Sequence, residues 1–218
     1  MKRQRKRKAM TERKLRGLYL VTPDLADTAT LVELARRALE GRPALLQYRS
    51  KQPDAALRRE QAAALVQPCR DAGVPLIVND DLQLALAIGA DGAHLGRDDG
   101  DIAAARAALG PKRILGVTCY NEWARAETGL VAGADYVAFG AVFSSPTKPA
   151  AVHAPLALLT RAHLELRCPV AAIGGITLEN ASAVVAAGAD LLAVISDVFD
   201  APDPGARVAA YAALFEPV

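Results

Sequence analysis

The sequence predicts a (β/α)8 TIM barrel, a single domain in which eight parallel strands close into a ring and each is followed by a helix. Short apolar runs alternate with longer helical patterns along the chain, which is the order of βα units in a parallel sheet. Eight such units fit into the 218 residues, a length typical of one α/β domain. The apolar runs are nearly continuous in Val, Ile, Leu and Ala, as expected of strands covered on both faces.

The elements follow from this alternation. The predicted strands cover residues 17–23, 44–50, 75–80, 92–96, 114–119, 136–142, 170–175 and 191–197. The predicted helical segments are rich in Ala, Leu, Arg and Glu and cover residues 28–40, 54–72, 101–109, 121–132, 155–166, 177–187 and about 205–215. A doubly wound open sheet is the alternative architecture, but no GxGxxG motif follows the first strand.

A weak internal repeat supports the closed barrel. The tripeptide Gly-Ala-Asp occurs at 89–91, 133–135 and 188–190, each time after a helical segment and just before a strand. Glycine there can take the left-handed conformation that ends a helix, and the aspartate then opens the next strand. These turns belong to the amino-end face of the barrel, so we expect them to be structural.

The first 16 residues differ in charge from the rest of the chain. They hold nine of the 26 Lys and Arg residues and one of the 24 Asp and Glu residues, which leaves 17 basic and 23 acidic residues in 17–218, a net charge of −6. Such a segment buries little apolar surface. We expect a disordered N-terminal extension (1–16), or a start at Met10, ahead of the barrel domain (17–218). Nonspecific binding of the tail to nucleic acid is the less favoured alternative.

The remaining composition indicates a cytoplasmic protein without a membrane partner. No apolar run reaches the roughly 18 residues of a membrane span, and the basic N-terminus lacks the apolar stretch of a secretory signal. Cys69, Cys119 and Cys168 are far apart and have no CxxC spacing, so we expect reduced thiols. The sequence allows a homo-oligomer but does not predict one.

In TIM barrels the active site forms at the carboxyl ends of the strands. At the second strand, Gln47, Arg49 and Lys51 are spaced by two, which puts all three on one face, the interior at the barrel mouth. Unpaired buried charge is costly, so two inward cations predict a bound anion. An ion pair with acids on neighbouring strands is the alternative.

Carboxylates follow the next two strands. The third strand ends in Asn79-Asp80-Asp81, and Asp98 and Asp99 follow the fourth. Neighbouring strands let Asp80 converge with Asp98 or Asp99. Two carboxylates beside cations suit Mg²⁺, which takes one or two carboxylates together with water and substrate phosphates. We expect Asp81 and Asp98 to cap a helix or face solvent.

The remaining strand ends offer hydroxyl groups, a third cation and backbone amides. After strand seven come two glycines, and strand eight leads into a helix, an arrangement that often binds phosphate in these barrels. The sequence thus predicts a cationic, metal-assisted anion site on strands two to four and six and a neutral, amide-based one on strands seven and eight. The residues concerned are Thr118, Ser145, Thr147, Lys148, Gly174, Gly175, Ile195 and Ser196.

Other residues are not expected to act in catalysis. His94, His153 and His163 have no metal-ligand spacing, and each is better explained by a core or surface position. The chain contains no GxSxG motif of a nucleophilic serine.

Seven segments together resemble the thiamine phosphate synthase (thiamine-phosphate pyrophosphorylase) family. The resemblance runs from about Gly17 to the end of the chain. Each segment is weak alone, whereas their order and spacing are specific. They are QYRSK (47–51), LIVNDD (76–81), GAHLGRDD (92–99), GVTCYN (116–121), SSPTKP (144–149), AIGGIT (172–177) and VIS (194–196).

The resemblance implies two phosphorylated substrates. The family joins a hydroxymethylpyrimidine diphosphate to a hydroxyethylthiazole phosphate and releases pyrophosphate. By resemblance, the pyrimidine diphosphate would be held by Gln47, Arg49, Lys51, Asn79, Thr118 and Lys148, and Mg²⁺ by Asp80 and Asp99. The thiazole phosphate would be held by Ser145, Thr147, Gly175, Ile195 and Ser196. Thr118 stands where the family commonly has serine; its hydroxyl keeps the contact, while its methyl group can alter the fit.

The implied reaction also assigns catalytic roles. Arg49, Lys51, Lys148 and Thr118 would stabilise the departing diphosphate, and the thiazole nitrogen would capture the pyrimidine methylene cation without a general base. Two alternatives stay open. A thiazole tautomerase of the related TenI type would keep only the phosphate site of strands seven and eight, and a non-catalytic barrel would bind a phosphorylated ligand.

Overall fold

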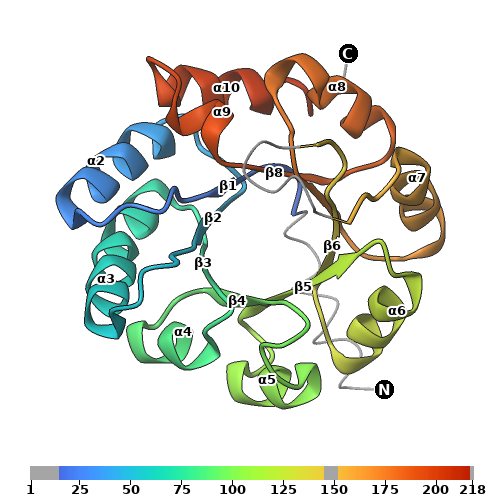
Figure 1. The fold of residues 1–218 in the computed structure, drawn as a ribbon, viewed down its shortest axis with the longest axis horizontal. Coiled ribbons are helices and arrows are strands. Elements are labelled where there is room, and N and C mark those ends of the chain that lie inside the picture. Colours follow the sequence, from blue (N-terminus) through green and yellow to red (C-terminus); the bar gives the residue numbers. More distant parts are fainter. Residues whose placement is uncertain (1–14, 145–151, 217–218) are drawn as a thin grey trace.

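The computed structural model describes residues 15–144 and 152–216. Eight parallel strands pair in chain order, and β8 returns to β1, so the sheet is a closed barrel. Figure 1 shows the ring of strands enclosed by helices. The predicted TIM barrel is therefore confirmed. The strands are β1 (Gly17–Val21), β2 (Leu45–Tyr48), β3 (Leu76–Asn79), β4 (Gly92–Leu95), β5 (Ile114–Tyr120), β6 (Tyr136–Gly140), β7 (Val170–Ile173) and β8 (Leu191–Val194).

The helices lie outside the strands (Figure 1). Two short ones, α4 and α9, were not among the predicted helical segments. Asp81 caps α4, because its side chain accepts a hydrogen bond of 2.8 Å from the Leu84 amide, as expected for this residue. The helices are α2 (Thr28–Leu39), α3 (Ala55–Ala72), α4 (Leu82–Ile88), α5 (Ile102–Leu109), α6 (Trp123–Ala132), α7 (Leu156–Glu165), α8 (Leu178–Ala186), α9 (Ser196–Phe199) and α10 (Pro204–Ala213).

The strands bury both faces, and the apolar residues divide accordingly into two clusters. The larger cluster packs the outer faces of the strands against the helices. The smaller one fills the barrel and includes Tyr19, Leu45, Ile77, Tyr136 and Leu191. Because successive strand residues point to opposite faces, residues two or four positions further along these strands also point inward. This alternation carries side chains from the apolar interior to the mouth.

The three Gly-Ala-Asp turns have the predicted conformation. Their glycines, Gly89, Gly133 and Gly188, have φ angles of 68°, 107° and 99°, in the left-handed region that ends a helix. Each aspartate also accepts a hydrogen bond from an amide at the start of the preceding strand. The pairs are Asp91 with Leu76 (2.9 Å), Asp135 with Leu115 (2.8 Å) and Asp190 with Val170 (2.9 Å). The repeat therefore joins strand starts at the amino end of the barrel.

The chain immediately before β1 contacts the barrel. Leu15 packs against the interior cluster, and the Arg16 guanidinium donates a 2.8 Å hydrogen bond to the carbonyl of Phe215. Both residues had been assigned to the N-terminal extension, of which residues 1–14 lie outside the described part. None of the helices in the described residues is both long and apolar enough to cross a membrane.

Candidate active site

The predicted site residues on the strands share the inward face at the barrel mouth. Gln47 lies two positions beyond Leu45, and Asn79 two positions beyond Ile77, both interior residues. Gln47 is only 4% exposed, and its amide nitrogen donates a 2.6 Å hydrogen bond to the Tyr19 hydroxyl inside the barrel. The strand alternation thus points Gln47 and Asn79 to the inner face of the barrel.

The two cations after β2 are held through their backbone. The buried Thr22 hydroxyl accepts from the amide of Arg49 (2.9 Å) and donates to its carbonyl (3.1 Å), while the Asp24 carboxylate accepts from the amide of Lys51 (3.1 Å). Arg49 is half-buried and Lys51 is exposed. Neither cation belongs to the ion pairs found among the described residues, which argues against the alternative that they serve only as structural ion-pair partners.

Asp80 and Asp99 converge at the ends of β3 and β4. Both carboxylates line the same cavity, and the charges and polar groups of Asp99, Arg49 and Asn79 act on Asp80. Desolvation of the carboxyl group and the neighbouring Asp99 carboxylate raise the pKa of Asp80 to about 6, although the Arg49 charge acts in the opposite direction. Of the two candidates after β4, the structure therefore selects Asp99, whereas Asp98 is exposed.

Local backbone geometry aims these two carboxylates. Asp80 has a φ of 62°, an unusual conformation that only a few residue types such as Asp and Asn tolerate. Its amide donates to the carbonyl of His94 (2.8 Å), which holds the end of β3 against β4. Asp99 turns back so that its carboxylate accepts from the Gly96 amide at 2.7 Å. A cavity of about 460 Å³ opens beside the pair, lined also by Arg58, Asn79 and Ser50.

The donor set around this cavity fits a hard divalent cation. Within residues 15–144 and 152–216, no group of three or more His, Cys, Asp or Glu side chains is arranged to hold a metal ion. A structural zinc site is therefore not formed by these residues. Mg²⁺ needs only one or two carboxylates and takes its other ligands from water and phosphate. Asp80 and Asp99 repel each other when no cation is present, and two such carboxylates are suitable ligands for Mg²⁺.

Thr118 is hydrogen-bonded to His94, a residue that the sequence pattern does not place in the site. The Thr118 hydroxyl lies 2.7 Å from Nε2 of His94, whose Nδ1 lies 2.8 Å from the Tyr136 hydroxyl. His94 is 6% exposed, so its expected core position is confirmed, but it also touches a predicted substrate contact. Arg125 on α6 supports the same corner, because it donates to the carbonyls of Thr118 (2.6 Å) and Gly96 (2.7 Å).

The end of β7 differs in one respect from the expectation. A Cβ atom on Gly175 would lie 2.7 Å from the Ser144 carbonyl oxygen and 2.8 Å from Cβ of Phe143. The missing side chain is therefore required by the chain that follows β6, and not only by a ligand. Gly175 has a φ of 63°, and its carbonyl accepts from the Asn180 side chain at 2.9 Å.

A carboxylate fixes the elements after β7 and β8 relative to each other. Asp197, in α9, accepts hydrogen bonds from the Leu178 amide at the start of α8 (3.2 Å) and from the Tyr211 hydroxyl (2.8 Å). Arg207 pairs with the same oxygen at 3.3 Å. Ile195 and Ser196 lie at the start of α9, where amides have no intrahelical partner. The sequence alone does not single out Asp197, because the role of its carboxylate depends on contacts with α8 and α10.

Three predicted residues, Ser145, Thr147 and Lys148, lie outside the described residues. Their place relative to the Asp80–Asp99 pair stays a prediction. The described residues bring together Arg49, Asn79, Asp80 and Asp99 at one side of the mouth.

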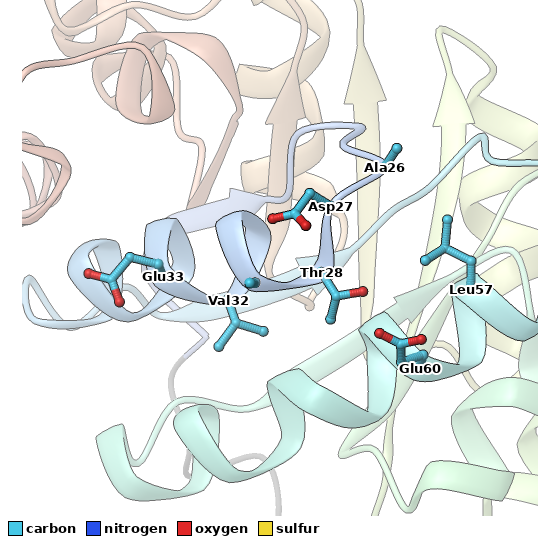
Figure 2. A pocket seen from close by; sticks show the side chains of 8 residues that line it. Ala26, Asp27, Thr28, Val32, Glu33, Leu57 and Glu60 are labelled. Atoms are coloured by element: carbon cyan, nitrogen blue, oxygen red, sulfur yellow. The ribbon is translucent and has the colours of Figure 1, made fainter.

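A second, larger hollow has the wrong charge for a phosphorylated ligand. It measures about 730 Å³ and lies between the start of α2 and α3. Figure 2 shows Thr28 and Val32 on α2 facing Leu57 and Glu60 on α3. Asp27, Glu33 and Glu60 line it without a basic side chain, and it lies outside the ring of strands. The candidate site is therefore the mouth.

Comparisons with known proteins identify the family of this chain. Residues 18–198 match a family model described as thiamine monophosphate synthase. The chain is 70% identical to the thiamine-phosphate synthase of Aromatoleum aromaticum over 95% of this chain and 100% of that protein, and 64% identical to that of an Azoarcus species over 93% and 98%. Its structure resembles the thiamine phosphate pyrophosphorylase from Pyrococcus furiosus, with a TM-score of 0.81 at 32% identity over 93% of this chain and 96% of that one. The chain belongs to the thiamine monophosphate synthase family.

Proposed function

We propose that this chain is a magnesium-dependent transferase that makes thiamine phosphate. It joins hydroxymethylpyrimidine diphosphate to hydroxyethylthiazole phosphate and releases pyrophosphate, the reaction that the family resemblance implies. The observation that carries this proposal is that Asp80 and Asp99 line one cavity at the strand ends, where the charge of Arg49 also acts on Asp80. Two carboxylates within the influence of a cation suit a diphosphate bound together with its metal ion.

The reaction exchanges one bond for another at the pyrimidine methylene carbon. The bond from this carbon to the diphosphate oxygen breaks, and the diphosphate takes the electron pair. The thiazole nitrogen then supplies its lone pair to form the new carbon–nitrogen bond. No proton has to be removed, so the site needs no general base. This agrees with the placement of His94, which is buried and hydrogen-bonded on both ring nitrogens.

The protein's main contribution is stabilisation of negative charge on the departing group. Arg49 and Lys51 stand at the end of β2 with their backbone fixed by Thr22 and Asp24, and Lys148 would add a third cation. Preorganised charges of this kind act where charge develops in the transition state. A Mg²⁺ ion held by Asp80 and Asp99 would supply further neutralisation of the leaving diphosphate.

The thiazole phosphate would bind on the opposite side of the mouth, at Gly175, Ile195 and Ser196 together with Ser145 and Thr147. The first turn of α9 offers amides there, and Asp197 fixes this turn to α8 and α10. Two separate anion sites are what a reaction between two phosphorylated substrates requires.

We also propose that the enzyme acts in the cytoplasm, alone or as a homo-oligomer. Its three cysteines are free thiols, and Cys69 and Cys119 are buried. Free thiols are typical of a reducing compartment.

The proposal is tested by measuring pyrophosphate release with both substrates, with and without Mg²⁺. We expect turnover only when both substrates and the ion are present. The Lys148→Ala variant should lower kcat by about 100-fold or more, because it removes a charge contact to the transition state.

The alternatives give different results in the same assay. A TenI-type tautomerase would change the thiazole phosphate by proton transfer and release no pyrophosphate. A non-catalytic barrel would bind a phosphorylated ligand without product. Undiminished turnover in Lys148→Ala would contradict the role assigned to this residue.

A further inference from the structure

A chain of hydrogen bonds crosses the barrel interior between two predicted substrate contacts. It begins at Gln47, whose Nε2 donates to the Tyr19 hydroxyl at 2.6 Å. The hydroxyls of Tyr19 and Tyr136 are 2.6 Å apart, and Tyr136 lies 2.8 Å from Nδ1 of His94. His94 Nε2 finally contacts the Thr118 hydroxyl at 2.7 Å. The chain runs through an otherwise apolar interior, where buried polar groups must satisfy one another.

The amide at one end sets the direction in which the hydrogens point. Because Gln47 supplies a hydrogen to Tyr19, the Tyr19 hydroxyl can give its own to Tyr136, and Tyr136 can give its own to Nδ1 of His94. If the hydrogens pointed the other way, the Tyr19 hydroxyl would accept from both Gln47 and Tyr136. Its own hydrogen would then have no acceptor among these hydrogen-bonded side chains. Both tyrosines are at most 1% exposed, so an unmet hydroxyl there is unfavourable.

This direction fixes the tautomer of His94. A ring nitrogen that accepts a hydrogen bond carries no hydrogen, so a His94 ring whose Nδ1 accepts from Tyr136 is neutral. A neutral imidazole has one N–H donor and one acceptor nitrogen. Nδ1 accepts from Tyr136, hence Nε2 carries the hydrogen and donates it to Thr118. The hydroxyl of Thr118 then has its own hydrogen free to point to the barrel mouth.

The sequence leaves space for these contacts at one position on β5. A Cβ atom on Gly116 would lie 2.1 Å from Cζ of Tyr136 and 2.5 Å from Nδ1 of His94. Neither approach is possible for real atoms, so any side chain at residue 116 would separate Tyr136 from His94. The close fit shows that the pair is part of the barrel's packing.

We propose that Tyr19, Tyr136 and His94 are positioning residues that orient the Thr118 hydroxyl as a hydrogen-bond donor to the departing diphosphate. The orientation of Thr118 follows from the hydrogen-bond chain alone. Its use toward a diphosphate rests on the proposed function. A donor already aimed at the leaving group needs no reorientation when negative charge develops there, which lowers the barrier.

The orientation is tested by NMR of the full-length protein labelled with ¹⁵N-histidine. The chain has three histidines, and the His153→Gln and His163→Gln variants assign the His94 signals. We expect a neutral ring with its hydrogen on Nε2. Tyr136→Phe removes the donor to Nδ1 and should shift His94 toward the other tautomer. Tyr48→Phe is the control. It removes a buried hydrogen bond from the Tyr48 hydroxyl to Gln61 (2.9 Å) that is not part of the series from Gln47 to Thr118, so the His94 signals should stay unchanged.

A wild-type ring with its hydrogen on Nδ1 would overturn the proposal, even if the Tyr136 variant failed to fold. This measurement needs no substrate. Absence of pyrophosphate release by the wild-type protein would refute the proposed function and leave the tautomer result standing, so the two failures can be told apart.

The catalytic consequence is tested by a double-mutant cycle. Thr118→Val, which keeps the shape and removes the hydroxyl, should lower kcat about 10-fold or more, with little change in the KM of either substrate. Thr118→Ser, which keeps the hydroxyl, should retain most of the activity that Thr118→Val loses. Tyr136→Phe should lower kcat about 10-fold. In the Thr118→Val background, Tyr136→Phe should cause no additional loss. An equal loss in both backgrounds would assign Tyr136 a merely structural role.

Discussion

The two ends of the barrel use aspartates in opposite ways. At the amino end, Asp91, Asp135 and Asp190 each accept a hydrogen bond from an amide on the preceding strand. At the carboxyl end, Asp80 and Asp99 face each other, and the proximity contributes to raising the pKa of Asp80. The carboxylates of the first group have hydrogen-bond donors within the fold, whereas the second pair raises the pKa of Asp80 and would gain a partner from the proposed Mg²⁺.

This difference separates stability from function along the barrel axis. A carboxylate with a donor on the neighbouring strand stabilises that pairing in every state of the enzyme. Two adjacent carboxylates destabilise the metal-free protein and become favourable only with a ligand. Strained or repelling groups of this kind concentrate at functional sites. The comparison predicts that substitutions at the two ends have opposite effects on stability and activity.

The largest effect is expected for Asp80→Asn. Asparagine tolerates the positive φ of residue 80, so the backbone should be retained while the charge is lost. We expect kcat to fall by about 100-fold or more, because the proposed Mg²⁺ site would lose a ligand. The melting temperature of the metal-free protein should rise, because the repulsion with Asp99 disappears. Pyrophosphate release and thermal unfolding in EDTA measure the two quantities.

Added Mg²⁺ provides the matching control for that variant. Saturating Mg²⁺ should raise the melting temperature of the wild-type protein, since a ligand that binds only the folded state stabilises it, and should raise that of Asp80→Asn much less. A variant that melts below the wild type in EDTA would show that Asp80 is a structural residue, and the contrast between the two ends would be lost.

A loss of stability without loss of chemistry is expected for Asp135→Ala. The carboxylate of Asp135 accepts from the Leu115 amide at 2.8 Å and pairs with Arg106. Its removal should lower the free energy of unfolding by about 1–3 kcal/mol, the cost of leaving such partners unmet. The kcat at 25 °C should stay within about twofold of the wild type, because the carboxyl-end loops are untouched. Urea unfolding and steady-state kinetics provide the two measurements.

Asp91→Ala and Asp190→Ala offer an internal comparison, since each of these aspartates has an amide partner but no ion pair among the described residues. They should lose less stability than Asp135→Ala. If Asp135→Ala abolished turnover in the folded protein, the amino end would have a catalytic role that this fold does not predict.

The sequence was sufficient to predict the barrel and the inward direction of the site residues on the strands. Both depend on local patterns: the alternation of strand and helix, and the two-residue period within a strand. The residue pattern after β4 allowed either Asp98 or Asp99 to approach Asp80, and only the family resemblance assigned Asp99 to the metal. The physical reason lies in how the loop after β4 turns, because the Gly96 amide donates a hydrogen bond to the Asp99 carboxylate.

Contacts across the barrel were also beyond the sequence. Tyr19 and Tyr136 are on β1 and β6, separated by 117 positions, and their hydroxyls meet because both side chains are long enough to reach the same point inside. The helix α4 was not predicted for another reason. Its sequence, LQLALAI, has one polar residue in seven, so it lacks the polar face by which a short helix is recognised.

A further effect is expected on the pH dependence of stability. The carboxyl pKa of Asp80 is about 6 in the folded protein, against an ordinary value of 3.8. The folded state therefore binds this proton more tightly than the unfolded state, and the resulting stabilisation is fully present below about pH 4. It is lost as the pH rises to about 6 and stays lost above that value.

This loss can be isolated by comparing the wild type with Asp80→Asn in urea unfolding without metal. Other titrating groups are common to both proteins, so their contributions cancel in the difference. The free energy of unfolding of the wild type should decline relative to the variant between about pH 4 and 6 and run parallel to it above. If the unfolding free energy of the wild type rose relative to the variant with increasing pH, the pKa of Asp80 would be lowered in the folded protein. Asp80 would then be stabilised by partners within the fold, as Asp91, Asp135 and Asp190 are.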